Sequence, residues 1–592
     1  MRWGKSQPAA AATTADSGGS IYLGRYYDVA NKAPGTELSY DGERHLLLFG
    51  PNGSGKGTRL LVSNLLRLRD RSLVVIDPKG ELTAITADYR RSLGEVVVLN
   101  PFNVLDLGGA GFNPLAALDP EAATFVDDAS GLGEALIKIE DGKDSHWSES
   151  AQNLVVALIM WEVQEAKRED RVPLLENVRR MLTEPNERDE GGKGKLTKGL
   201  GYTVRRMAVM GGFEIESLVG RFLRDSDEIA SIQSTADRQT SWMLSPLMRA
   251  NMAKNDIDFA DLKKRPITVY LILPAERMRT HSVWLRLVIV SALRALYKPG
   301  GLRTLFMLDE FAQLGHLAPI EDAFGLVRGY GVQLWPVLQD LNQLKALYKD
   351  RWETFVGNAG VVQGFAPNDL TTAEWMSRRA GDTTVAAAGY NRGDAQTSAG
   401  QGSMSQSTGL SYSQARRPLF LPQELMDFRE GSGLLWPAGT SKSVPFAAPS
   451  YWDVSEFKSR AGSNPYYQSP TAQTASAKVP APAFASADDS LHDVKGAWAK
   501  ASTHIKAAIK WTATNALRFA RWAAKTAARE LPPLMRKVHA FALQCARVIK
   551  EEFRAFRQTP EGHETAAKIE NPGPPVEASR DAPEQIIPSE EG

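Results

Sequence analysis

The chain has 592 residues, of which 70 are Lys or Arg and 69 are Asp or Glu, so its formal net charge is +1. A near-neutral total excludes a globally basic coat for nucleic acid, although it leaves room for a local basic patch. A hydrophobic content of 43% and a charged content of 23% are ordinary for a globular protein with a sizeable core. The single cysteine, Cys545, excludes an intrachain disulfide and a cysteine-rich metal site.

The start of the chain carries no sign of a membrane segment. Residues 1–20 are rich in Ala, Thr, Ser and Gly and lack the apolar stretch of a secretory signal, so we expect a disordered arm there. The longest apolar stretches are Leu154–Trp161 and Trp284–Tyr297. Both are shorter than the roughly 20 residues that a spanning helix needs. We therefore expect no transmembrane helix in this sequence.

Seven short runs rich in Val, Ile and Leu recur along the chain with helical patterns between them. None alternates cleanly with polar residues, which is typical of parallel strands buried on both faces. The sequence therefore predicts an α/β fold with a mostly parallel sheet covered by helices. The expected strands are His45–Phe49, Leu73–Ile76, Val96–Leu99, Ile267–Leu273, Thr304–Leu308, Val332–Leu338 and Ala359–Phe365.

A long stretch between the third and fourth expected strands has little β character, and its apolar residues recur at helical spacing. We therefore predict an all-α domain, residues 128–257, inserted into a nucleotide-binding α/β domain made of residues 21–127 and 258–468. Gly191–Gly199 is expected to be a loop within the insertion. Ala387–Gln414, rich in Gly, Ser, Gln and Ala, is expected to be a long flexible loop.

Three segments follow the α/β domain. Residues 469–490 are rich in Ala, Pro, Ser and Thr and are expected to be a linker. Residues 491–558 have a helical pattern, with fourteen Lys or Arg against four acids, a net charge of +10. Residues 559–592 carry eight acids against two basic residues, a net charge of −6, and their Pro/Glu-rich composition predicts a disordered tail.

The basic extension, residues 491–558, interleaves aromatic residues with Lys and Arg, among them Trp498, Trp511, Phe519 and Trp522. Three interpretations stay open. The pattern is compatible with binding to single-stranded nucleic acid by stacking and charge. It is equally compatible with an anionic membrane surface. The third interpretation is a packed or partner-binding amphipathic hairpin with a solvated basic face.

The strongest motif is a glycine-rich loop between the first expected strand and a helical pattern over Thr58–Leu68. Its residues are Gly50, Pro51, Asn52, Gly53, Ser54, Gly55, Lys56, Gly57 and Thr58. This is the context of a P-loop, whose backbone N–H groups surround the phosphates of ATP. Lys56 is expected to neutralise the β- and γ-phosphates. Gly57 replaces the usual Ser or Thr, so either Thr58, rotated by about 100°, or water completes the Mg²⁺ site.

A second strand, Thr304–Leu308, ends in two carboxylates at the sheet edge where α/β proteins bind ligands. Asp309 is expected to hold Mg²⁺ through water, and Glu310 to act as the general base that orients the attacking water. Gln339 ends the strand Val332–Leu338, where its amide either senses the γ-phosphate or makes a loop hydrogen bond. Asp77 follows a further strand and is expected to cap a turn.

These motifs together resemble the type IV secretion coupling proteins, the TraG-like conjugative DNA-transfer ATPases, from about residue 22 to residue 465. The stretches that carry the resemblance are GPNGSGKG, VVIDPKGEL, VVVLNPF, FNPLAAL, HWSESAQNL, TVYLILPAE, LFMLDEFAQLG, GYGVQLWPVLQDLNQL, FVGNAGVVQGF and SRRAG. The resemblance implies a RecA-like core that uses ATP and Mg²⁺. Lys56, Asp309 and Glu310 match the family's catalytic positions, and Gln339 matches its sensor. Arg328 matches an arginine that reaches the neighbouring subunit's nucleotide; the alternative is an ordinary surface residue.

The same resemblance implies a homo-hexamer around a channel for single-stranded DNA or unfolded protein. The implied partners are relaxase–DNA or protein substrates and inner-membrane components of a type IV secretion system. Members usually carry a pair of N-terminal transmembrane helices, which we do not find here, so we expect a cytoplasmic protein peripheral at the inner membrane. Two alternatives stay open: a soluble adaptor that keeps the ATPase fold as a scaffold, and a cytoplasmic DNA translocase unrelated to secretion.

Overall fold

The computed structural model describes residues 18–466, except residues 30, 32, 140–144, 190–193, 224–226 and 397–403. Within this range it describes side chains other than those of residues 327–328, 386–396 and 404–413. The expected arm before residue 18, the linker 469–490, the basic extension 491–558 and the acidic tail 559–592 lie outside the described residues. Among those described, no helix is both long and apolar enough to cross a membrane.

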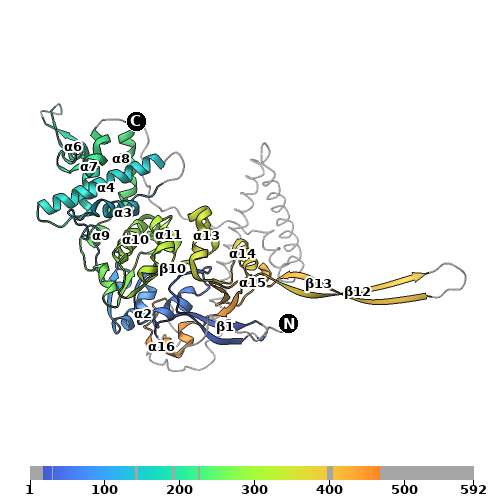
Figure 1. The fold of residues 1–592 in the computed structure, drawn as a ribbon. Coiled ribbons are helices and arrows are strands. Elements are labelled where there is room, and N and C mark those ends of the chain that lie inside the picture. The colour runs from blue at the N-terminus through green and yellow to red at the C-terminus, as the bar shows by residue number, and fades with distance from the viewer. Residues whose placement is uncertain are drawn as a thin grey trace, which may run out of the picture. The chain divides into compact units, whose positions relative to one another are not determined.

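An eleven-stranded sheet, in the order β2-β1-β15-β14-β11-β3-β10-β9-β4-β8-β5, forms the centre of the fold (Figure 1). From β11 to β5, seven neighbouring strands run parallel. Each matches one of the seven expected strands within two residues, so the predicted mostly parallel α/β fold is confirmed. Their bounds are β3 (His45–Phe49), β4 (Arg71–Ile76), β5 (Glu95–Leu99), β8 (Ile267–Leu271), β9 (Arg303–Leu308), β10 (Val332–Leu338) and β11 (Ala359–Phe365).

The sheet continues beyond β11 with four antiparallel strands that sequence analysis did not predict. They are β14 (Ser432–Pro437), β15 (Val444–Ala447), β1 (Ile21–Asp28) and β2 (Ala33–Tyr40). These strands mix apolar residues with Gly, Pro, Ser and Thr, and β2 is mostly exposed along its first half. Only β2 is an edge strand, and a strand that is paired on one side and partly solvated needs no continuous apolar run. The other three are short or interrupted by Gly, Pro or polar residues, so the pattern that marks the central strands is absent from them.

Hydrophobic layers cover both faces of the sheet. Leu47 and Phe49 of β3 belong to one layer and Leu46 and Leu48 to the other, because side chains alternate along a strand. Burying one such side chain contributes about 1.5–3 kcal/mol. The first layer packs on α3 (Phe125–Leu136), α10 (Ala275–Leu296), α11 (Ala318–Leu326), α12 (Leu341–Tyr348), α13 (Trp352–Asn358), α14 (Leu370–Ala380) and α15 (Pro422–Met426), and the second on α1 (Val62–Leu65), α2 (Glu81–Arg91) and α16 (Ser455–Arg460).

A mainly helical region lies between β5 and β8 in the chain. Its helices after α3 are α4 (Ser145–Arg168), α5 (Leu175–Thr183), α6 (Leu200–Met210), α7 (Phe213–Val219), α8 (Asp227–Thr240) and α9 (Pro246–Met252). The expectation of an all-α insertion with a loop at Gly191–Gly199 is wrong in one respect. The short strands β6 (Glu187–Arg188) and β7 (Leu196–Lys198) pair there. They are charged and exposed, so no apolar pattern marked them. The division into two domains stays a prediction, since both parts belong to one compact unit.

The expected flexible loop Ala387–Gln414 is also corrected. The strands β12 (Asp382–Gln396) and β13 (Met404–Pro418) cover most of it, and they pair in register from Asp382↔Pro418 to Gln396↔Met404. They form a two-stranded sheet of their own (Figure 1). Small polar residues suggested a loop, but ladder hydrogen bonds join backbone N–H and C=O groups, which do not depend on the side chain.

Candidate functional site

The glycine-rich loop connects β3 to a π-helical turn, η1 (Lys56–Leu61), which continues into α1. The Gly50 N–H donates to the Leu338 carbonyl at 2.9 Å and thereby ties the loop to the end of β10. The Arg59 N–H donates to the Gly55 carbonyl at 2.8 Å and closes the first helical turn. Gly53 and Gly55 both have φ near 82°, a left-handed conformation that glycine adopts without a steric cost.

The loop leaves room and polar groups for an anion. The Ser54 side chain is buried, and its Oγ has no hydrogen-bond partner among the described residues. A Cβ added at Gly53 or Gly57 would meet no other heavy atom within 4 Å. Thr58 Oγ1 donates to the Gly55 carbonyl at 3.4 Å. A buried unpaired hydroxyl beside open backbone fits phosphate oxygens, which accept several hydrogen bonds at a helix N-terminus.

Lys56 joins this loop to the carboxylates at the end of β9. Its side chain is buried, and Nζ donates to the Gly50 carbonyl at 3.2 Å. The same Nζ lies 3.7 Å from Glu310 Oε1. The sheet order explains this contact, because β10 is the only strand between β3 and β9 and all three end at the same edge.

Glu310 is held in an unusual backbone conformation. Its φ is 51° and its ψ is 40°, in the left-handed region, at the point where β9 passes into the turn η8 (Phe311–Leu314). For a residue with a side chain this costs of the order of 1–3 kcal/mol, and such strain gathers at functional sites. The conformation places Oε2 3.1 Å from Gln339 Nε2, which donates to it. The sequence-predicted residues Lys56, Glu310 and Gln339 therefore meet at one point.

Asp309 lies partly buried beside this cluster. Burial raises its pKa to about 7; the charge of Lys56 opposes this shift, and the charge of Glu310 adds to it. One oxygen, Oδ1, accepts the Glu310 N–H at 3.0 Å. An acid that is costly to ionise next to a second carboxylate is a site where a cation would be stabilising.

Asp77, at the end of β4, adds a carboxylate to the edge of the sheet where Lys56, Asp309, Glu310 and Gln339 lie, which we call the rim. Its Oδ2 accepts both the N–H and the Oγ1–H of Thr83, each at 2.7 Å, so it caps the start of α2. Burial raises its pKa, and its charge contributes to the raised pKa of Asp309. Sequence reasoning found the cap but missed the influence on Asp309. This influence arises because β4 and β9 are neighbours in the sheet, which brings Asp77 close to Asp309.

The remaining candidate residues are placed less completely. The backbone of Arg328 lies in η9 (Val327–Tyr330), but its side chain is outside the described part of the chain. Pro51 and Asn52 lie in the loop turn, where the Ser54 N–H donates to the Pro51 carbonyl at 3.1 Å. Sequence reasoning did not single out Arg59, whose guanidinium bonds residues almost 400 positions away. Its position on η1, three residues after Lys56, is the only signal for it in the sequence.

The rim fits a magnesium ion that arrives with a phosphate. Within the described ranges, no three His, Cys, Asp or Glu side chains are grouped to hold a metal by themselves. Mg²⁺ in phosphate-transfer sites instead uses one or two carboxylates, phosphate oxygens and water. Asp309, partly buried and with a raised pKa, and Thr58, on the first turn of η1, are the side chains available for that role.

Comparison with known proteins places these features in a family. The chain is similar to the conjugal transfer protein TraG of Escherichia coli, with 29% identity over 474 residues, 75% of this chain and 70% of that protein. A second E. coli TraG is 29% identical over 429 residues, 69% of this chain and 65% of that protein.

Solved structures show the same fold. The unbound conjugative coupling protein TrwB, as TrwBdeltaN70, aligns with a TM-score of 0.53 and 17% identity over 72% of this chain and 88% of that one. This likeness confirms the predicted α/β P-loop fold. Residues 6–474 match the family model described as type IV secretory system conjugative DNA transfer. The match covers well over half of the sequence, and the chain therefore belongs to the type IV secretory system conjugative DNA transfer family.

Proposed function

We propose that the chain is an ATP-driven coupling protein that recruits DNA or protein–DNA substrates and translocates them to a type IV secretion or conjugation channel. The observation that carries the proposal is the meeting of Lys56, Glu310 and Gln339 beside Asp309, in a chain of this family. The TrwB structures include complexes with a non-hydrolysable ATP analogue and with ADP and Mg²⁺. We extend the same ligands, ATP and Mg²⁺, to this chain.

Each residue of the rim has its own role in ATP hydrolysis. The backbone of Gly53–Gly57 binds the phosphates, and Lys56 neutralises the β- and γ-phosphates. Glu310, held by Gln339 at 3.1 Å, accepts the proton of the attacking water. Gln339 links this base to the strand next to the P-loop. Mg²⁺, held by Asp309 and Thr58, supplies positive charge to the phosphate oxygens when it is bound.

The finer assignments form part of the same proposal. The chain acts as a homo-hexamer in which Arg328 completes the neighbouring subunit's site. Its substrates are single-stranded DNA with a relaxase, or protein. It works in the cytoplasm at the inner membrane, docked on secretion components, and the net +10 charge of residues 491–558 supports an added contact with anionic lipid.

Steady-state ATP hydrolysis with and without single-stranded DNA tests the proposal, beside a Glu310→Gln variant. We expect turnover that rises with DNA and is lost in the variant. Binding of ATP without any turnover would favour the alternative of a soluble adaptor that keeps the ATPase fold as a scaffold. DNA-stimulated turnover in a protein that captures no type IV secretion component would favour a cytoplasmic DNA translocase.

A further inference from the structure

One buried arginine holds the turn that follows the carboxylates of β9. Arg286 of α10 is 3% exposed and donates four hydrogen bonds, all to backbone carbonyls. Its Nη1 donates to the Leu314 carbonyl at 3.0 Å and to the His316 carbonyl at 2.6 Å. Its Nε donates to the Ala135 carbonyl at 2.9 Å, and its Nη2 to the Glu134 carbonyl at 3.0 Å. One guanidinium therefore joins the end of η8 to the last turn of α3.

The strained residue of the site begins this turn. Glu310 has a left-handed backbone, which persists only where the surrounding structure over-determines it. Its carbonyl accepts the Gln313 N–H at 2.9 Å, so a shift of η8 would move Glu310 with it. A group that fixes the end of η8 therefore also fixes the carboxylate of Glu310 against Lys56 and Gln339.

Packing fixes η8 on one side only. Phe311 and Leu314 are buried, but the backbone beyond them borders a cavity of about 340 Å³, lined among others by His316, Leu317 and Arg286. Burial lowers the pKa of Arg286 to about 10, so the guanidinium stays charged at neutral pH. Hydrogen bonds from a charged donor are stronger than those between neutral groups. The bonds of Arg286 therefore hold the side of the turn that packing leaves open.

The other end of this connection is anchored in the helical region. Just after α3, the Lys138 N–H donates to Gln239 Oε1 at 2.6 Å, and Gln239 Nε2 donates to the Lys138 carbonyl at 2.9 Å. Gln239 belongs to α8. A continuous path of hydrogen bonds and backbone thus runs from α8 through the end of α3 and Arg286 to the turn that begins at Glu310.

We propose that Arg286 is a positioning residue for hydrolysis, which joins η8 to α3 and so makes the position of Glu310 depend on the helical region. The inference rests on the proposed function, in which Glu310 accepts the proton of the attacking water. A planar guanidinium with five donors reaches four carbonyls at once, whereas the donors of a lysine spread from a single nitrogen. None of the four bonds involves the P-loop, so Arg286 sets the rate of turnover and not the affinity for nucleotide.

Steady-state ATP hydrolysis and calorimetric titration with Mg·ADP, both on the full chain, separate positioning from binding. Arg286→Lys is expected to lower kcat per ADP-binding site by about ten-fold or more, because a small misplacement of a reacting group is costly. The KM for ATP and the Kd for ADP should stay within about two-fold of wild type. Arg294→Lys is the matched control. Arg294 also lies on α10 and donates to α3, at the Asp127 carbonyl and the Asp128 carboxylate, but at the start of that helix and away from η8. Its kcat should stay within about two-fold of wild type.

Gln239→Ala breaks the same connection at its other end and removes no buried charge. It is expected to lower kcat about three-fold, with no further loss when it is added to Arg286→Lys, because residues that act through one connection are not additive. Gln233→Ala is its control, since Gln233 also lies on α8 but donates to the Leu182 carbonyl.

A kcat of Arg286→Lys at the wild-type level would overturn the inference alone, as would an equal loss in Arg294→Lys or a matching loss of ADP affinity. If Arg286→Lys fails to fold, an unchanged kcat in Gln239→Ala would overturn it. A wild-type chain that hydrolyses no ATP would instead overturn the proposed function.

Discussion

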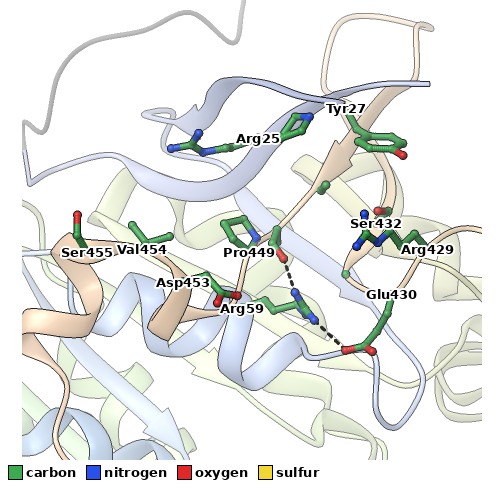
Figure 2. Close-up of a pocket in the computed structure, with 14 residues that line it drawn as sticks. Arg25, Tyr27, Arg59, Arg429, Glu430, Ser432, Pro449, Asp453, Val454 and Ser455 are labelled. Atoms are coloured by element: carbon green, nitrogen blue, oxygen red, sulfur yellow. Dashed lines mark hydrogen bonds and ion pairs between the residues drawn. The ribbon is translucent and has the colours of Figure 1, made fainter. Parts of the chain in front are cut away.

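The parallel and antiparallel halves of the sheet carry different kinds of information. The parallel strands β3, β9 and β10 are buried, and the residues that follow them are the charged and glycine-rich groups of the phosphate site. The antiparallel strands β14, β15, β1 and β2 carry no motif, yet they border a cavity of about 640 Å³ that Arg59 also lines (Figure 2). Phosphate chemistry needs fixed charges at fixed spacing, which a sequence displays. A cavity wall needs only side chains of suitable shape and size, which many sequences supply.

The largest expected effect is on the rate of ATP hydrolysis, which should depend on the parallel half and not on the antiparallel half. Glu310→Gln is expected to lower the rate of ATP hydrolysis by about 10²–10⁴-fold, because the amide no longer accepts a proton. Its ADP affinity should stay within a few-fold of wild type. Glu430→Gln, on the antiparallel side, serves as the control in steady-state assays, because Glu430 holds Arg59 but touches no reacting group. An equal loss of turnover in both variants would contradict the division of roles.

We expect a histidine in the parallel half to make the free energy of unfolding depend on pH. His45 of β3 is buried; its Nδ1 accepts the Leu334 N–H at 3.0 Å, and its Nε2 donates to the Ala323 carbonyl at 3.2 Å. Burial lowers its pKa from 6.5 to about 4. Between these values the unfolded chain binds a proton that the folded chain does not, so stability is present above pH 6.5 and is lost as pH falls to 4. The shift corresponds to about 3 kcal/mol.

Urea denaturation across pH 4–6.5 measures this contribution. His45→Gln should unfold with a shallower dependence on pH than wild type, by about one proton. Identical slopes in wild type and His45→Gln would show that the buried imidazole does not govern acid stability.

The junction between the halves is expected to be as tightly packed as the parallel strands. Gly433 of β14 lies opposite Phe365 of β11, and a Cβ there would clash with the Gly364 carbonyl oxygen. Gly433→Ala should therefore destabilise the chain by about 1–3 kcal/mol, measured by denaturant unfolding. In Gly357→Ala the new Cβ of α13 meets nothing within 4 Å, and the variant should gain up to about 1 kcal/mol. Unchanged stability of Gly433→Ala would mean that the junction can open.

The same contrast decides what could be predicted from the sequence. Continuous apolar runs located the seven parallel strands, and the parallel arrangement brings Lys56 and Glu310 together at one edge. The roles of these residues stay predictions. Arg59 and Glu430 are 371 positions apart, and their contact depends on the course of the antiparallel strands, which show no continuous apolar run. The left-handed backbone of Glu310 is equally invisible, because nothing in its type or neighbours demands it.

The smallest expected effect comes from the two strands that are in neither half. β12 and β13 pair only with each other among the described strands, and a lone two-stranded hairpin is marginally stable. Replacing residues 387–413 by Asn-Gly would close the ladder just after the pair Ala386↔Gln414 with a turn that suits the twist of a hairpin. The free energy of unfolding should change by less than about 0.5 kcal/mol, since the main sheet keeps every strand. A loss of stability as large as that of Gly433→Ala would show that the hairpin packs on the sheet. Unchanged stability together with lost stimulation by DNA would place its role in handling substrate rather than in the fold.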